Sequence, residues 1–190
     1  MALHAGRHPL GTDSGRIVLR TFRDGLAAQA GHDLMIEVGR WSGELVVNDD
    51  LDPADLEVRI EMTSLTVLEG TGGLKPLTDR DRREIAVTAR RVLGADRHSD
   101  ATFSATKFVR TTGGDGVING SLTLASVTRP LQLQVSATGP DRYRAITSVK
   151  QSDFGIKPYT AFFGALRVRD AVDVEVDFRW PAGPGPEAPA

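Results

Sequence analysis

Cysteine is absent from the 190-residue sequence. Disulfide bonds, thiolate metal sites and a cysteine nucleophile are therefore excluded, while the redox state of the compartment stays open. An excess of one charge is also lacking, because 23 basic residues oppose 25 acidic ones and leave a net charge of -2. Proteins that bind nucleic acid usually carry a basic excess, so we expect no nucleic-acid partner.

Long apolar runs are missing as well. No segment approaches the roughly 20 apolar residues of a membrane-spanning helix. The opening stretch MALHAGRHPLGTDSG holds no apolar run long enough for a signal peptide. The 40% hydrophobic and 25% charged residues are typical of a globular protein. We therefore expect one cytoplasmic domain that does not span a membrane.

Two alternating segments lie at residues 116–137, GVINGSLTLASVTRPLQLQVSA. A period of two is typical of β-strands, because successive side chains leave on opposite faces. The apolar members fall on one face: Ile118, Leu122, Leu124, Leu131, Leu133 and Val135. The pattern predicts a hairpin of half-buried strands. We place Pro130 at the start of the second strand, since proline has no N–H for the ladder.

Alternation recurs along most of the chain. It predicts further strands over residues 15–22, 34–37, 41–47, 56–62, 101–109, 142–150 and 171–180. We expect 34–37 and 41–47 to form a second hairpin that turns near Gly39. A sheet with one polar face must bury the other, and closure into a barrel also removes its edges. The pattern favours a mainly β fold, an antiparallel barrel of about eight strands whose apolar interior holds either a ligand or only its own side chains.

The period changes after residue 77. Thr78 and Asp81 resemble a capping box, in which the two residues satisfy each other's backbone N–H groups. Apolar residues then recur on one helical face: Ile85, Ala89, Val92 and Leu93. Gly94 is typical of the position just past a helix C-terminus. At 1.5 Å per residue this helix is about 22 Å long, enough to cap the mouth of a small barrel.

The other segments lack a regular pattern. We expect a flexible lead-in over residues 1–14 and a disordered Pro/Gly/Ala tail over residues 181–190, so that the barrel domain spans residues 15–180. Residues 24–31 are predicted to hold a short alanine-rich helix. Residues 67–77 contain three glycines, and we expect a loop that acts as a flap beside the barrel mouth.

Three groups of residues contain chemically useful side chains. His32 and Asp33 suggest a general base with an orienting carboxylate, although adjacent side chains usually diverge. Residues 98–100, His-Ser-Asp, have the residue types of a hydrolytic triad, but consecutive residues cannot converge on a substrate. The helix dipole alone explains Asp79 and Asp81 in the first turn of the helix, without a cation. We therefore expect no catalytic residue, metal ion or cofactor.

The strand at 100–108, DATFSATKF, followed by GVINGSLTLASVTRPLQLQV, resembles the YceI-like family. The upstream stretches PADLEVRIEMTSLTV and TDRDRREI and the downstream KQSDFGI resemble further elements of that family, so that the likeness covers residues 15–178. Ser126 stands where the family usually has glycine, and we expect no secretion signal here, although one is frequent in the family. The resemblance implies an elongated, lipocalin-like antiparallel β-barrel with a capping helix. It also implies that the barrel carries a polyisoprenoid or another long apolar molecule without chemistry, and it makes a homodimer an expectation.

The predicted ligand is therefore an apolar lipid, isoprenoid-like or acyl, held inside the barrel. The residues expected to line its site are Phe103, Ile118, Leu122, Leu124, Leu131, Leu133 and Val135, with Phe154, Phe162 and Phe163 at the mouth. The aromatic loop at 154–163 either plugs the barrel or lines its entrance.

Two alternatives to lipid binding stay open. One is an enzyme that acts on a small hydrophobic substrate through His32 and Asp33. The other is a packed barrel that serves as a stress-response or interaction module, with no cavity larger than a few water molecules.

Overall fold

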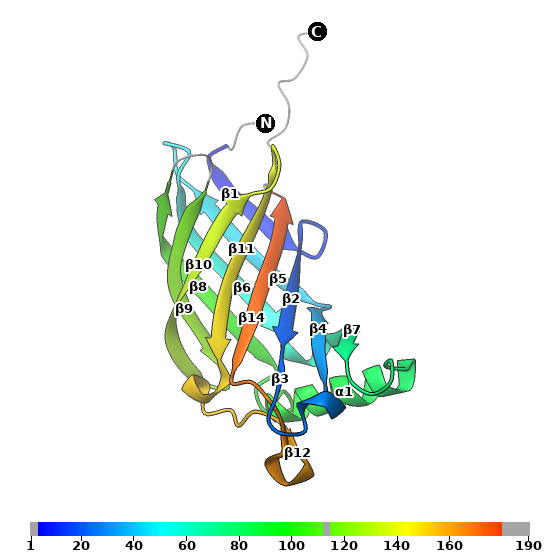
Figure 1. Cartoon of the computed structure of the whole chain (residues 1–190). Coiled ribbons are helices and arrows are strands. Elements are labelled where there is room, and N and C mark those ends of the chain that lie inside the picture. The colour runs from blue at the N-terminus through cyan, green and yellow to red at the C-terminus, as the bar shows by residue number, and fades with distance from the viewer. Residues whose placement is uncertain (1–3, 112–114, 180–190) are drawn as a thin grey trace.

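The computed structural model describes residues 4–111 and 115–179 (Figure 1). The predicted tail at 181–190 lies outside these residues. The described chain is mainly β, as predicted, with one α-helix, α1 (Asp79–Val92). Its largest sheet has eleven strands in the order β1-β5-β6-β8-β9-β10-β11-β14-β2-β4-β7, and all neighbouring strands are antiparallel. The strand count is thus larger than the predicted eight.

The strands of the large sheet are β1 (Gly6–Gly11), β2 (Gly15–Thr21), β4 (His32–Val38), β5 (Trp41–Val47), β6 (Pro53–Glu61), β7 (Leu65–Gly72), β8 (Asp100–Arg110), β9 (Gly116–Leu124), β10 (Val127–Ala137), β11 (Arg142–Lys150) and β14 (Ala171–Arg179). A small sheet contains β12 (Thr160–Ala161), β13 (Leu166–Val168) and β3 (Arg23–Asp24). Short 3₁₀ turns are η1 (Ala28–Ala30), η2 (Met62–Ser64), η4 (Gln151–Phe154) and η5 (Phe162–Gly164). The large sheet curls around a central space, and α1 and the small sheet lie at one end of it, the lower end in Figure 1.

A long, bent, two-stranded ribbon joins the two sides of the curled sheet. Strand β4 continues into β5 across Gly39 and Arg40, and β6 continues into β7 through η2. Pairing persists through the bend, where the Gly39 N–H donates to the Ser64 carbonyl and the Glu61 N–H donates to the Arg40 carbonyl. Strand β4 also pairs with β2, and β6 pairs with β8, so this ribbon completes the wall.

The predicted hairpin between 34–37 and 41–47 is therefore wrong. The chain bends near Gly39 but does not reverse, because β4 pairs with β7 and β5 pairs with β6. A Cβ at Gly39 would lie 2.9 Å from the Ser64 carbonyl oxygen, so glycine permits this close approach of the two strands. The actual turn of the ribbon is at Asn48–Asp52, where the Asn48 side chain accepts from the Asp52 N–H.

The hairpin predicted at 116–137 is confirmed as β9 and β10. Its two-residue turn has Ala125 and Ser126 at φ values of 48° and 65°, the left-handed geometry that such tight turns require. Pro130 is the fourth residue of β10, whereas we predicted it at the start. Strand β10 pairs with β11 only from Gln134 onward, so the missing N–H at Pro130 breaks no ladder bond.

Three expectations for irregular segments need correction. Residues 6–11 of the supposed flexible lead-in form β1, which pairs with β5 along its whole length. Most of the supposed loop at 67–77 belongs to β7, which pairs with β4. Backbone pairing at a sheet edge stabilises both segments although neither has a regular apolar alternation. The predicted helix at 24–31 is only the 3₁₀ turn η1, because the Asp24 carboxylate binds Arg167 and the Gly25 N–H instead of capping a helix.

Helix α1 agrees closely with the prediction. Thr78 and Asp81 form the capping box, and Gly94 follows the C-terminus with a φ of 66°. Ile85 and Ala89 pack against the core through the predicted apolar face. Figure 1 shows the helix crossing the lower end of the curled sheet, so it occupies the position of a cap.

Candidate functional site

The curled sheet encloses a cavity of about 1330 Å³. Most strands of the large sheet contribute aliphatic side chains to its wall, and α1 contributes its apolar face. The wall follows directly from alternation: on β14, Val172, Val174 and Val176 line the cavity, while Glu175 and Asp177 form ion pairs with Arg144 outside. A packed barrel without a cavity, the second alternative from the sequence, is contradicted by this volume.

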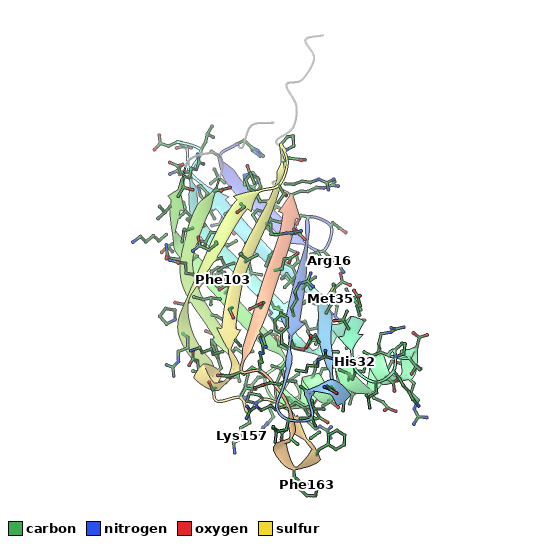
Figure 2. The ribbon with its side chains drawn as sticks, in the orientation of Figure 1. Arg16, His32, Met35, Phe103, Lys157 and Phe163 are labelled. Atoms are coloured by element: carbon green, nitrogen blue, oxygen red, sulfur yellow. The ribbon has the colours of Figure 1, made fainter. Side chains whose placement is uncertain are left out.

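Seven of the ten predicted ligand-binding residues line the cavity: Phe103, Ile118, Leu122, Leu124, Leu131, Leu133 and Val135. The three residues placed at the mouth lie elsewhere. Phe154 is buried in the hydrophobic core and is not part of the cavity wall. Phe162 is 62% exposed and Phe163 is fully exposed; Figure 2 shows Phe163 at the tip of the lower end, pointing away from the sheet.

The prediction omitted much of the wall. Ile17, Leu19 and Val58 line the cavity, as do Ile85 and Ala89 on α1. The signal was present, because these residues are the inward members of alternating or helical patterns. The predicted site was restricted to β8, β9 and β10 because it was centred on the segment that carries the family resemblance.

Polar groups gather at the lower end of the cavity, beside α1 and the small sheet. They are Arg23, His32, Lys75, Asp81, Glu84, Tyr159 and Arg167. Several are already engaged: Arg167 pairs with Asp24 at 3.0 Å, and the Arg23 guanidinium donates to the Gly31 carbonyl at 2.8 Å. Hydrogen bonds from the Thr78 hydroxyl and N–H hold the pKa of Asp81 below its usual range. This rim is polar but its charges are mostly neutralised locally.

The opposite end of the cavity is also polar. Arg110, Asp115 and Asp141 lie there, and Arg110 pairs with Asp52 of the β5–β6 turn at 3.1 Å. Tyr143 stacks on Phe178 just inside, with ring centroids 5.6 Å apart. The cavity is therefore an apolar tube with a polar rim at each end.

His32 and Asp33 do not act as a pair. His32 begins β4 and lines the cavity, with its Nε2 2.8 Å from the Lys75 carbonyl oxygen. Asp33 instead accepts from the Arg23 N–H at 2.8 Å, and no contact joins the two side chains in the part of the chain that the structure describes. A carboxylate that orients the imidazole, which the enzyme alternative requires, is thus not provided by Asp33.

The other chemically suggestive groups are also separated. His98 Nδ1 lies 3.0 Å from the Ser126 hydroxyl of the β9–β10 turn, whereas Asp100 binds Ser99 and Arg59. Within residues 4–111 and 115–179, no group of three or more His, Asp or Glu side chains is arranged to hold a metal ion. In the same residues, no helix has the length and apolar character needed to cross a bilayer.

Comparison with known proteins identifies the family. The profile of the YceI-like domain matches residues 26–180, most of the chain. The chain belongs to the YceI-like family. Among sequence relatives of this YceI-like chain, a UPF0312 protein of Shewanella sp. strain W3-18-1 is 33% identical over 104 residues, 50% of this chain and 54% of that protein. A UPF0312 protein of Shewanella oneidensis is 40% identical over 74 residues, 34% of this chain and 39% of that protein. In such matches the chain spans about half the length of its relatives or less.

Solved structures share the fold of this YceI-like chain. BcnA of Burkholderia cenocepacia is 14% identical with a TM-score of 0.56, over 86% of this chain and 94% of that one. A polyisoprenoid binding domain from Saccharophagus degradans, implicated in plant cell wall breakdown, is 12% identical with a TM-score of 0.56, over 93% and 99%. The YCEI protein of Campylobacter jejuni is 18% identical with a TM-score of 0.55, over 78% and 85%.

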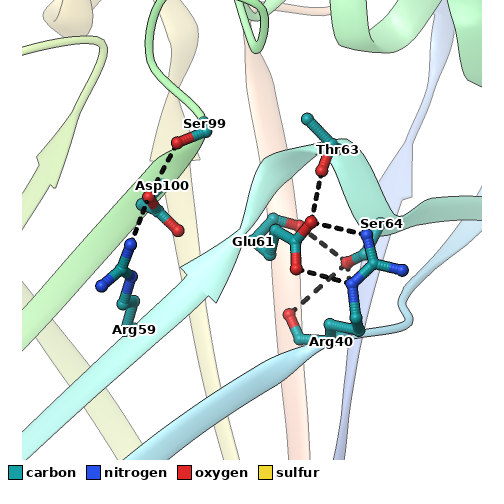
Figure 3. Close-up of polar contacts among 7 residues, drawn as sticks. All are labelled: Arg40, Arg59, Glu61, Thr63, Ser64, Ser99 and Asp100. Atoms are coloured by element: carbon teal, nitrogen blue, oxygen red, sulfur yellow. Dashed lines mark hydrogen bonds and ion pairs between the residues drawn. The ribbon is translucent and has the colours of Figure 1, made fainter.

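A polar network fastens the bend of the ribbon in this YceI-like domain (Figure 3). The Arg40 guanidinium donates two hydrogen bonds to the Glu61 carboxylate, and the Thr63 hydroxyl donates a third at 2.6 Å. The Arg40 N–H also donates to the Ser64 hydroxyl at 2.9 Å. These contacts connect the two strands where they bend, and so they hold the wall of the cavity in shape.

Glu61 should therefore titrate far below an ordinary glutamate. Its bonds with Arg40 and Thr63 lower its pKa from 4.5 to about 2. A carboxyl whose pKa is lowered by folding stabilises the native state fully above its unfolded pKa and loses that contribution as pH falls through the folded one. We expect carboxyl NMR to give a Glu61 midpoint near pH 2, and Arg40→Gln to raise it towards 4.5. A midpoint near 4.5 in the unsubstituted protein would show that the bend network does not form.

Proposed function

We propose that this YceI-like domain binds one long apolar molecule, an isoprenoid-like or acyl lipid, inside its cavity and does not transform it. The proposal rests on the cavity of about 1330 Å³, which has an aliphatic wall along its length. Pockets for drug-sized ligands usually measure about 300–1,000 Å³, so this cavity has room for a larger molecule. Because the wall is apolar, its main contribution to binding is removal of the ligand's hydrocarbon chain from water.

Removal of the ligand's hydrocarbon chain from water contributes enough free energy for tight binding. Burial of each CH₂ group contributes about 0.8 kcal/mol, from which the cost of ordering the chain is subtracted. The seven predicted residues on β8, β9 and β10 would contact the chain together with the facing residues on β2, β11 and β14. The polyisoprenoid binding described for the Saccharophagus degradans domain supports an isoprenoid as the first class to test. The separation of His32 from Asp33 supports binding without catalysis.

Extraction of the purified protein with organic solvent, followed by mass spectrometry, tests this proposal. We expect a lipid with a long apolar chain in about one copy per protein. The lipid-free protein should then be titrated with prenyl alcohols of increasing length, and both affinity and thermal midpoint should rise with chain length until the cavity is filled. The proposal fails if no lipid is extracted and no prenyl or acyl lipid stabilises the fold. Homodimer formation stays a prediction, which light scattering on the same sample would measure.

A further inference from the structure

A small lobe projects beyond the lower end of the large sheet (Figure 1). We define the lobe as residues 22–31 and 155–169, which contain the small sheet with η1 and η5. The two segments are joined by backbone hydrogen bonds from the Ala27 N–H to the Ala165 carbonyl and from the Arg169 N–H to the Phe22 carbonyl. The lobe is therefore one folded unit built from segments that are distant in sequence.

Its tip is unusually apolar for a surface. Leu26 and Phe163 are fully exposed, and Phe162 is 62% exposed. Phe162 and Phe163 have φ values of 50° and 56°, the left-handed region that bulky residues avoid. This backbone turns the Phe163 ring away from the protein (Figure 2). Large apolar side chains that gather at one exposed site usually mark a surface that contacts another protein or a membrane.

The tip lies next to the opening of the cavity. Tyr159, Leu166 and Arg167 belong to the lobe and also line the lower end of the cavity. Leu74, which is 79% exposed, and Lys75 line the same end from the β7–α1 loop. A surface that covers the lobe would therefore lie beside this end of the cavity.

The charge of the lobe is opposite to that of the whole chain. Four basic residues (Arg23, Lys157, Arg167 and Arg169) and one acidic residue, Asp24, give it a net charge of +3, while the chain carries -2. Arg167 pairs with Asp24, and Arg23 pairs with Asp33 just outside the lobe, so Lys157 and Arg169 carry the positive charge that the lobe offers to a partner. Lys157, Arg167 and Arg169 are exposed. Basic residues around an apolar tip are the composition that binds an anionic lipid surface, since the charges attract the headgroups while the apolar side chains enter the acyl region.

We propose that the lobe docks this protein on an anionic lipid bilayer, with Leu26, Phe162 and Phe163 inserted and Lys157 and Arg169 among the headgroups. The lower end of the cavity then lies next to the membrane. This docking uses only the outer surface of the lobe, so it holds whatever the cavity contains. It goes beyond the proposed function, and vesicle binding and lipid extraction can fail independently.

Sedimentation with vesicles of phosphatidylcholine, with and without phosphatidylglycerol, tests the docking. The variant is Phe162→Asn with Phe163→Asn, because asparagine tolerates positive φ better than other side chains and so preserves the fold. The matched control is Leu51→Asn, at an exposed leucine with a φ of 63° in the β5–β6 turn, at the other end of the sheet. All three proteins should unfold at similar temperatures.

We expect the unsubstituted protein and Leu51→Asn to bind the anionic vesicles equally. The double variant should bind at least about tenfold more weakly. Binding should also weaken as salt is raised, because the headgroup attraction is screened. The proposal is overturned if the unsubstituted protein ignores anionic vesicles or if the folded double variant binds them as well as the control. It is equally overturned if light scattering shows that the two phenylalanines instead join two copies of the chain, without vesicle binding.

Discussion

Replacing Thr147 by tryptophan should weaken binding of a long apolar ligand more than a hundredfold. Thr147 points into the cavity from β11, at the level of Val174 on β14. The cavity has room for an indole there, so the fold should survive while the tube is obstructed. Each CH₂ group that is no longer buried costs about 0.8 kcal/mol, so loss of four costs about 3 kcal/mol, more than a hundredfold in Kd.

The control is Ile146, the residue that precedes Thr147 on β11. Ile146 is 50% exposed on the outer face and pairs with Glu175, so Ile146→Trp adds the same ring outside the cavity. Calorimetric titration of lipid-free protein with one prenyl alcohol should give near-normal affinity for Ile146→Trp and little binding for Thr147→Trp. Equal affinities for two folded variants would place the ligand outside the barrel and contradict the proposed function.

The same inside–outside alternation explains why most of the wall could be predicted. The inward side chains of β11 and β14, such as Thr147 and Val174, are fixed by a period of two that is local in sequence. The capping box at Thr78 is equally local, and it is found as predicted. Features of this kind need only a short segment of sequence and no knowledge of its partner.

Strand pairing is not local, and it accounts for the failures. Gly39 between two apolar segments is a typical turn signal, but here the glycine serves to admit the Ser64 carbonyl of a distant strand. Strand β1 has few apolar residues, and its pairing with β5 depends on a partner more than thirty residues away. In neither case does the local sequence contain the information that decides the structure.

The direction of loop side chains is also unpredictable from sequence. The aromatic residues near the end of the chain look alike, yet Phe154 is buried and Phe163 is fully exposed, because the left-handed backbone at η5 turns the chain outward. Ser126 stands where the family usually has glycine, and its backbone geometry explains that preference. Its φ of 65° explains why glycine is usual there, and its hydroxyl contacts His98. A family pattern thus indicates a constraint on the backbone, and the structure reveals how a different residue meets it.

Gly120 provides the second large effect, on stability. This glycine interrupts the apolar face of β9, and a Cβ there would lie 2.4 Å from the Ser104 carbonyl oxygen and 2.6 Å from Cζ of Phe103. The Phe103 ring therefore lies over the glycine as a diagonal neighbour from β8. We expect Gly120→Ala to lower the free energy of unfolding by about 2–3 kcal/mol, as overpacking of a well-packed wall does. In a domain of this size the thermal midpoint should fall by roughly 5–10 °C.

Three further variants separate the causes of this loss: Phe103→Leu, its combination with Gly120→Ala, and Gly139→Ala. Phe103→Leu removes the ring but not the Ser104 carbonyl, so Gly120→Ala in that background should still destabilise the fold, though less. Gly139→Ala is the matched control, because its nearest neighbour would be an ordinary contact at 3.6 Å with Arg142 Cβ. Calorimetric unfolding of Gly120→Ala, these three variants and the unsubstituted protein, five proteins in all, should leave the control near the starting stability. If Gly120→Ala were as stable as Gly139→Ala, then β8 and β9 would not approach as closely as the cavity wall requires, and the glycine would only limit the size of the side chain that faces the ligand.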